Sequence, residues 1–223
     1  MNVRCGFPPF RLSGVVYGTL MNHRSAVAAL GERASAAPYK APPKAPVLYI
    51  KPRNTLAESG SEVLVPEDSP ELEVGACLGL VIGRPASHVS LENALDHVGG
   101  YLLVADISVP HDTFYRPSIR LKARDGFCPL APAATPRAAI DNPNALTIRT
   151  FVDGALQQSA DTSDVVRSVE QLLVDVTEFM TLAPGDVLAT GVAAGAPRVR
   201  AGQSVRIEAA GLETLSCSFV RRT

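Results

Sequence analysis

The sequence of 223 residues predicts an α+β fold in which a mixed β-sheet is flanked by a few helices. Apolar segments of strand length recur along the chain and are bounded by Gly, Pro, Asn or Asp. Few segments show the three- and four-residue spacing of apolar side chains that is typical of helices. Strands and helices do not alternate regularly, which argues against a doubly wound parallel sheet.

The amino-terminal part predicts a strand, a helix and a second strand. Residues 12–20 are rich in Val, Tyr and Gly and are typical of a strand. Residues 25–37 are rich in Ala and place apolar side chains at helical spacing. Residues 38–52 are rich in proline and lysine, which indicates an extended connection, and their apolar part at 47–50 predicts the second strand.

The middle of the chain predicts two strands separated by a helix. Residues 76–82 form a continuous apolar run that ends in Gly and Pro, as expected of a strand buried on both faces. Ser90 is a candidate N-cap for a helix over residues 91–98, which two glycines end. Residues 101–109 then predict a long strand.

The carboxyl-terminal part contains the most regular helical pattern. Apolar residues recur at three- and four-residue intervals over residues 164–181, with Thr162 and Ser163 as caps and a Pro-Gly pair after the end. The segments around this helix that predict strands are residues 146–152, 186–190, 204–209 and 214–220.

Charge and hydropathy exclude several classes of protein. The chain carries 21 basic and 22 acidic side chains and has no basic run that would bind nucleic acid or an anionic membrane. No apolar run approaches the roughly 20 residues that cross a bilayer, and no signal peptide is evident. We therefore expect a cytoplasmic protein with no nucleic-acid or membrane partner. It should form one domain over residues 14–223 after an extension over residues 1–13.

The cysteines and the common catalytic motifs narrow the function further. Cys5, Cys77, Cys128 and Cys217 are far apart and form no C-x-x-C pair, so we expect buried free thiols. The sequence has no G-x-S-x-G, G-x-x-x-x-G-K-[ST] or H-E-x-x-H motif. Serine-hydrolase, P-loop and zinc-protease chemistry are therefore not indicated.

A series of motifs resembles one known family. In chain order the motifs are GTLMNH (18–23), LYIKPRNTL (48–56), GLVIGR (79–84), VGGYLLVADIS (98–108), FYRP (114–117), KARDGFCPLAP (122–132) and EFMTLAPGDVLATG (178–191). Their order and spacing resemble the fumarylacetoacetate hydrolase family over residues 14–208. Within that family the chain is most similar to the amino-terminal half, or the corresponding separate subunit, of bifunctional isomerase/decarboxylases of 4-hydroxyphenylacetate breakdown.

The resemblance implies a fold and a chemistry. The fold is a mixed β-sheet with a few flanking helices. The family holds magnesium or manganese with three carboxylates, and the ion stabilises the enolate that forms when a proton, an acyl group or a carboxylate leaves the substrate. Two of these ligands form a Glu-x-Glu pair on one face of a strand, just before an Ile-Gly dipeptide.

The ligand positions are only partly filled in this chain. Counting back from Ile-Gly places the Glu-x-Glu positions at Gly75 and Cys77, whereas the third ligand is retained as Asp106. Glu71 and Glu73 lie upstream, and a slipped register would bring Glu73 to the ion. That slip displaces the ligand by roughly 6 to 7 Å, so a solvated strand entrance is the favoured interpretation of both glutamates. The resemblance thus implies no metal in this chain alone.

Lys122 and Asp106 are the candidate catalytic residues. Lys122 matches a family lysine that points to the substrate and stabilises developing negative charge. The alternative is an ordinary ion pair of Lys122 with Asp106 or Asp125. Active relatives have a histidine on a short helix where this chain has Ala26, and His23 is interpreted either as a helix cap or as a proton carrier.

Substrate-binding candidates come from the retained cationic and aromatic residues. These are Lys51, Tyr115, Arg116 and Arg124. A substrate with several carboxylates would be bound by guanidinium and ammonium groups. The alternative is that Arg116 and Arg124 support loops by bonding backbone carbonyls. The family's loop contact to the substrate is altered here to residues 190–193, Thr-Gly-Val-Ala.

The resemblance implies a subunit of an isomerase/decarboxylase that acts on unsaturated oxo-tricarboxylates in 4-hydroxyphenylacetate catabolism. The small-molecule oxo-acid substrate would be bound in a homo-oligomer, or in a heteromer with a metal-binding paralogous subunit. The alternative is a catalytically depleted, metal-free scaffold that pairs with a carboxylate-complete partner.

Overall fold

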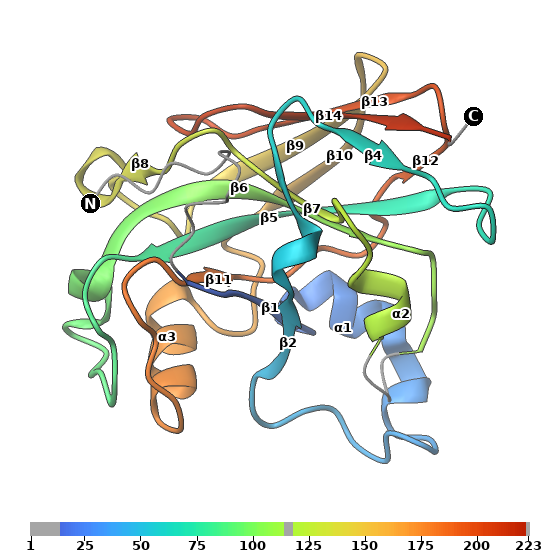
Figure 1. The fold of residues 1–223 in the computed structure, drawn as a ribbon. Helices are drawn as coiled ribbons and strands as arrows, with labels where there is room; N and C mark the ends of the chain where they lie inside the picture. Colours follow the sequence, from blue (N-terminus) through green and yellow to red (C-terminus); the bar gives the residue numbers. More distant parts are fainter. Residues whose placement is uncertain (1–13, 114–117, 222–223) are drawn as a thin grey trace.

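The computed structural model describes residues 14–113 and 118–221. These residues form two β-sheets and three α-helices (Figure 1). The five-stranded sheet lies on one side of the long strands β5 and β6, and the helices lie on the other side. The α+β class and the mixed sheet that the sequence predicts are confirmed.

The elements have the following bounds. The strands are β1 (Val16–Leu20), β2 (Val47–Lys51), β3 (Leu56–Glu58), β4 (Glu62–Leu64), β5 (Leu72–Ile82), β6 (Val98–Ser108), β7 (Cys128–Leu130), β8 (Thr135–Pro136), β9 (Thr147–Val152), β10 (Ala155–Asp161), β11 (Val187–Ala189), β12 (Arg198–Val199), β13 (Ser204–Glu208) and β14 (Leu215–Val220). The α-helices are α1 (Arg24–Leu30), α2 (Ile119–Lys122) and α3 (Val169–Thr177), and 3₁₀ turns cover Gly31–Ala34, Arg53–Thr55, Ala94–His97 and Arg137–Ala139.

The larger sheet is organised around the antiparallel pair β5 and β6. Its strand order is β2-β1-β11-β5-β6-β7-β3, with β12 also pairing with β5 and β8 with β6. The pair runs in register from Glu73 opposite Ser108 to Val81 opposite Gly100. The smaller sheet has the order β10-β9-β13-β14-β4. Both 11-residue strands are almost wholly buried, as expected of strands covered on both faces.

The core fills the space between the two sheets and under α3. The largest fully buried side chains include Tyr101, Phe127, Phe219, Leu72, Leu78, Leu80, Ile82, Leu102, Leu103 and Leu172. The predicted buried thiols are confirmed for Cys77, Cys128 and Cys217, whereas Cys5 lies outside the described residues. The predicted extension over residues 1–13 lies outside the described residues, so the boundary at residue 14 stays a prediction.

The helix predicted over 164–181 is half as long as its apolar pattern indicates. It spans Val169–Thr177 and is capped by Ser168, whose side chain accepts from the Gln171 N–H, so the predicted caps Thr162 and Ser163 are wrong. Residues 164–167 instead bond to the end of β1, because Val166 N–H donates to the Asn22 carbonyl at 2.7 Å. Tertiary backbone bonds replace the first helical turn there.

Two other helices are also shorter than predicted. The Ala-rich segment 25–37 is helical only to Leu30, because Gly31 adopts a positive φ of 54° and the chain continues as a 3₁₀ turn. The segment 91–98 contains a 3₁₀ turn in place of an α-helix. The His97 carbonyl accepts from Gly83 N–H at 2.8 Å and so ties this segment to the end of β5.

The predicted strands are confirmed with shifted ends, and several short ones were missed. Strand β5 begins four residues earlier than predicted. Strand β10 has the sequence ALQQSAD and is mostly exposed at the edge of the smaller sheet, so it lacks the alternating apolar pattern of a half-buried strand. No helix of the described residues is long and apolar enough to cross a membrane.

Replacing Leu78 by alanine should destabilise the fold by about 2–5 kcal/mol, because the side chain is 0% exposed at the centre of β5 and a cavity would remain. Denaturant unfolding monitored by circular dichroism measures the loss. The matched control is Leu156→Ala on β10, where the side chain is 52% exposed and the change should stay within about 0.5 kcal/mol. Equal losses at the two positions would contradict the assignment of the core.

Candidate functional site

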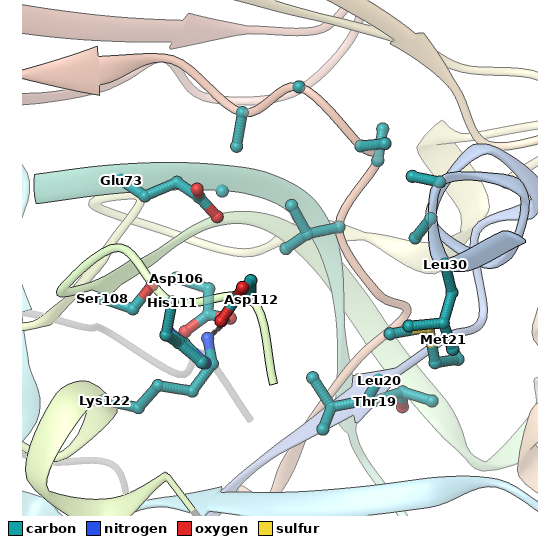
Figure 2. Close-up of a pocket in the computed structure, with 18 of the residues that line it drawn as sticks. Thr19, Leu20, Met21, Leu30, Glu73, Asp106, Ser108, His111, Asp112 and Lys122 are labelled. Atoms are coloured by element: carbon teal, nitrogen blue, oxygen red, sulfur yellow. Dashed lines mark hydrogen bonds and ion pairs between the residues drawn. The ribbon is translucent and has the colours of Figure 1, made fainter. Parts of the chain in front are cut away.

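A cavity of about 430 Å³ opens between the ends of several strands and helix α1 (Figure 2). Its polar lining includes Thr19, Arg33, Tyr49, Glu73, Asp106, Ser108, His111, Asp112, Lys122 and Arg198. Its apolar lining includes Leu20, Met21, Ala26, Ala29, Leu30 and the loop around Val192. The cavity thus has an apolar wall on the α1 side and a charged wall on the β5–β6 side.

The charged wall follows from the register of β5 and β6. Glu73 lies opposite Ser108, and Gly75 lies opposite Asp106. Residues opposite each other in an antiparallel pair, and residues two apart along a strand, share one face of the sheet. Therefore Glu73, Gly75, Asp106 and Ser108 all face the cavity. Gly75 thus faces the cavity beside Asp106, while its correspondence to a family ligand position stays a prediction.

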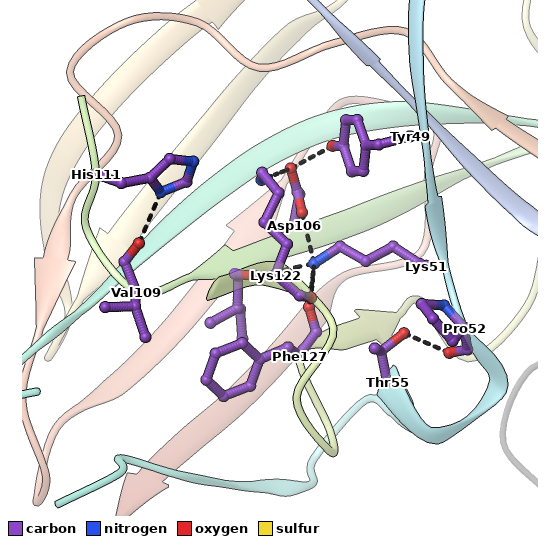
Figure 3. A network of polar contacts seen from close by, with 10 residues as sticks. Tyr49, Lys51, Pro52, Thr55, Asp106, Val109, His111, Lys122 and Phe127 are labelled. Carbon is purple, nitrogen blue, oxygen red and sulfur yellow. Dashed lines mark hydrogen bonds and ion pairs between the residues drawn. The ribbon is translucent and has the colours of Figure 1, made fainter. Parts of the chain in front are cut away.

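Two buried lysines hold the Asp106 carboxylate, as Figure 3 shows. Lys122 Nζ donates to Oδ2 at 2.7 Å, and Lys51 Nζ lies 2.7 Å from Oδ1. Lys51 also donates to the carbonyl oxygens of Ile107 at 2.9 Å, Lys122 at 3.0 Å and Phe127 at 2.9 Å. These carbonyls use the three N–H groups of Lys51, so its contact with Oδ1 is an ion pair without a directed hydrogen bond.

Tyr49 completes the cluster from strand β2. Its hydroxyl donates to Asp106 Oδ2, and its ring centroid lies 4.8 Å from Lys122 Nζ, within the range of a cation–π contact. The ring lies against Gly18 of β1, where an added Cβ would come within 2.0 Å of the ring. Glycine at position 18 is therefore required for Tyr49 to reach the carboxylate.

The electrostatics of the cluster keep its groups in defined protonation states. Burial opposes the ionisation of Asp106, but the ammonium groups of Lys122 and Lys51 outweigh burial and hold the pKa of this carboxyl well below its usual range. Burial and the Asp106 charge raise the pKa of Tyr49, so the phenol stays protonated as a donor. Two ammonium groups against one carboxylate leave the cluster with one net positive charge.

The residues present do not fit the family's divalent cation. Gly75 has no side-chain donor, and an added Cβ would lie 2.6 Å from both methyl groups of Val192. Burial raises the pKa of the Cys77 thiol, which disfavours the thiolate that binds metals. Asp106 is already paired with lysines. Among the described residues, no group of three His, Cys, Asp or Glu side chains is arranged to hold a metal ion.

The predicted catalytic and substrate-binding residues separate into two groups. Lys122 and Asp106 line the cavity, and the alternative that they form an ion pair holds as well. Lys51 lies beneath the cavity as a support for Asp106 and is not part of its lining. Arg124 is also outside the lining. Its Nε donates to the Arg120 carbonyl oxygen at 2.9 Å, as the loop-supporting alternative predicts, and its guanidinium makes two bonds to Asp68 at 2.8 and 2.9 Å. Substrate binding by Arg124 is therefore not supported.

Tyr115 and Arg116, the remaining substrate-binding candidates, lie outside the described residues. His23 is the N-cap of α1, where its side chain accepts from the Ser25 N–H, and it does not line the cavity. Ala26 does line the cavity, at the place where the resemblance puts a histidine. The interpretation of His23 as a cap is therefore supported over that of a proton carrier.

The two upstream glutamates have different roles. Glu71 pairs with Arg198 at 3.0 Å and with Arg200 at 3.6 Å, in agreement with the predicted solvated strand entrance. Glu73 lines the cavity and is about half-buried, so the same prediction is wrong for it. The physical reason is that β5 begins at Leu72, which gives Glu73 the strand parity of Gly75.

Tyr49 and Val192 were missed as site residues. Tyr49 stands two residues before Lys51 on β2, so strand parity alone placed both side chains on one face. Val192 lies in the altered 190–193 loop that the sequence indicates, but its approach to Gly75 joins segments more than a hundred residues apart and was not predicted.

Replacing Asp106 by asparagine should destabilise the protein by about 3–5 kcal/mol, because two buried ammonium groups lose their counter-charge. Denaturant unfolding at neutral pH measures this loss. The control is Asp68→Asn, which breaks an exposed ion pair with Arg124 and should cost much less.

The wild-type protein should also lose stability as the pH falls below about 4, since the folded pKa of Asp106 lies below the unfolded value, and D106N should lack this component. A stable D106N variant with an unchanged acid dependence would contradict the pairing.

Comparison with known proteins agrees with this geometry. Residues 15–220 match the family model for the fumarylacetoacetate hydrolase C-terminal domain. The 4-hydroxyphenylacetate degradation bifunctional isomerase/decarboxylase of Salmonella dublin is 42% identical over 204 residues, which are 92% of this chain and 46% of that protein. The chain therefore spans about half the length of this relative. The correspondence to one half of a two-part enzyme is supported, and its assignment to the amino-terminal half stays a prediction.

Solved structures share the fold. The 5-carboxymethyl-2-hydroxymuconate delta-isomerase of Mycobacterium smegmatis superposes with a TM-score of 0.79 at 28% identity, covering 95% of this chain and 80% of that one. A maleylpyruvate hydrolase of Sphingobium sp. SYK-6, solved with manganese and pyruvate, superposes with a TM-score of 0.77 at 25% identity, covering 94% and 71%. Because the family model matches residues 15–220, and the motifs and the fold agree with that match, the chain belongs to the fumarylacetoacetate hydrolase family.

Proposed function

We propose that the chain is a component of an isomerase/decarboxylase for unsaturated oxo-tricarboxylates in 4-hydroxyphenylacetate catabolism. The reactions concerned are 5-carboxymethyl-2-hydroxymuconate isomerisation and 5-oxopent-3-ene-1,2,5-tricarboxylate decarboxylation. The similarity to the Salmonella enzyme and to the Mycobacterium isomerase supports this assignment. The component would work in the cytoplasm on a small oxo acid.

The observation that carries the proposal is the Lys122 ammonium at the cavity wall. Asp106 and the Tyr49 ring hold this group in place, and Lys51 supplies the charge that balances Asp106. Enolisation of a 2-oxo acid places negative charge on the former carbonyl oxygen, and a fixed cation in a sheltered site stabilises that charge. Lys122 would thus supply by itself the positive charge that a metal ion supplies in related subunits.

The cavity also suits the proposed substrate in size and charge. Its volume of about 430 Å³ lies within the range usual for small-molecule sites. Arg33 and Arg198 line it in addition to Lys122, and their guanidinium groups would bind the substrate carboxylates. The apolar wall of α1 would contact the unsaturated carbon chain.

A second candidate is a scaffold without chemistry of its own. The side chains of Ala26 and Val192 favour it, because one replaces a polar group of active relatives and the other fills the space of a ligand. In that case the chain would stabilise a metal-binding paralogous subunit in a heteromer. The enzyme component would instead act in a homo-oligomer or beside that subunit.

Replacing Lys122 by alanine should lower kcat/KM for 5-carboxymethyl-2-hydroxymuconate by about 10²–10³-fold, because the charge on the enolate oxygen loses its fixed cation. Loss of the dienol absorbance of the substrate measures turnover by the purified chain. Lys44→Ala is the control, since this lysine is exposed and does not line the cavity. Activity that appears only after the partner subunit is added, and that is indifferent to Lys122, would support the scaffold instead.

The purified chain should retain wild-type thermal stability after dialysis against a chelator, and addition of magnesium or manganese should not raise its Tm. The reason is that Gly75 and Cys77 offer no hard oxygen ligands and Asp106 is paired with lysines. Elemental analysis and thermal unfolding measure this together. One tightly held magnesium or manganese per chain would contradict the proposed metal-free site.

A further inference from the structure

Glu73 is a half-buried carboxylate in the cavity wall. It lies on β5, two residues before Gly75, and its side chain points into the cavity (Figure 2). Lys122 approaches the same cavity from α2, and Asp106 lies between these two side chains in the view. A substrate in the cavity would therefore have a carboxylate on one side and an ammonium group on the other.

Glu73 is available for chemistry because it has no hydrogen bond or ion pair within the described part of the chain. Two other acidic groups at this end of the sheet are paired, Glu71 with Arg198 and Arg200, and Asp106 with its lysines, whereas Asp112 also lines the cavity. A buried carboxylate without a partner is costly to the fold. A cost of this kind at a cavity wall is typical of groups kept for function.

Resting on the proposed function, we infer that Glu73 is the acid–base group of an isomerase that uses no metal. The enol hydroxyl proton of the substrate passes to the Glu73 carboxylate, and the Lys122 ammonium stabilises the enolate oxygen. The double bonds then shift along the conjugated chain, and the Glu73 carboxylic acid protonates the far carbon. One O–H bond breaks, one C–H bond forms, and Glu73 returns to its starting state.

The surroundings of Glu73 suit this role. Burial raises its pKa above the usual value for a glutamate, although Lys122, His111 and Arg198 oppose that change and Asp106 adds to it. A carboxyl group with a raised pKa accepts and returns a proton more readily near neutral pH. These four groups lie on α2, the loop after β6, β12 and β6, and have the largest effects of charged side chains on Glu73, while Asp112 and Arg33 line the same cavity.

His111 is the rival for the same role, since it also lines the cavity. Its Nδ1 lies 2.8 Å from the Val109 carbonyl oxygen, so Nδ1 donates there and the ring orientation is fixed by the end of its own strand. The two residues are therefore compared directly in the test.

The test is isomerisation of 5-carboxymethyl-2-hydroxymuconate by the purified full-length chain and its Glu73→Gln variant. Glutamine keeps the size of the side chain and breaks no ion pair, so the variant should fold with wild-type stability. Its kcat should fall about 10²-fold or more with little change in KM, and Glu73→Asp should recover part of the rate. Glu62→Gln on β4, a carboxylate in the other sheet, should be as active as the wild-type chain.

The other results each overturn the inference. If the wild-type chain isomerises the substrate and Glu73→Gln does so at the same rate, the inference fails and the proposed function stands. A large fall in kcat for His111→Asn, together with an active Glu73→Gln, assigns the proton transfer to His111. Absence of turnover in the wild-type chain overturns both the inference and the enzymatic form of the proposed function.

Discussion

The arrangement of the site depends on the Asp106 carboxylate and the two lysines that surround it. Burial of any of these charges without a partner would cost the fold several kcal/mol, so each of the three groups requires the others. The pairing also fixes geometry, because Lys51 bonds carbonyls of three separate segments and so ties β6, α2 and the start of β7 together. Asp106, which the resemblance places at a family ligand position, thus anchors a structural network in this chain.

The site differs from a metal site of three carboxylates in volume as well as in charge. Opposite Asp106, Gly75 leaves room that the Val192 side chain fills to within van der Waals contact, and a carboxylate at position 75 would collide with it. Restoring a ligand by a single substitution would therefore require the 190–193 loop to move. A carboxylate at position 75 and the present packing of this loop therefore exclude each other.

The sequence predicts the sheet better than the helices or the site. Strands β5 and β6 were recognised because continuous apolar runs allow few other structures, whereas the pairing of Gly75 opposite Asp106 was not predicted. The helix predicted over 164–181 was longer than the observed helix, because periodicity does not reveal that Val166 bonds to Asn22, far away in sequence. The sequence indicated Lys51 as a substrate-binding residue and Tyr49 only as part of a strand. The carbonyls that accept from Lys51, and the glycine that leaves room for the Tyr49 ring, come from other parts of the chain. Contacts of this kind need tertiary structure.

The charge of the network bears on which half of a bifunctional reaction this site would serve. Lys122 is one fixed monovalent cation, whereas a divalent ion chelates two substrate oxygens and withdraws electrons from both. Proton transfer between an enol oxygen and a conjugated carbon passes through an enolate whose charge is spread over several atoms. One ammonium group can stabilise this charge, and a nearby carboxylate can transfer the proton. Decarboxylation releases an electron pair that needs a stronger electron sink at the adjacent carbonyl. Under the proposed function, this cavity would therefore serve isomerisation, and decarboxylation would fall to a subunit that holds a metal ion.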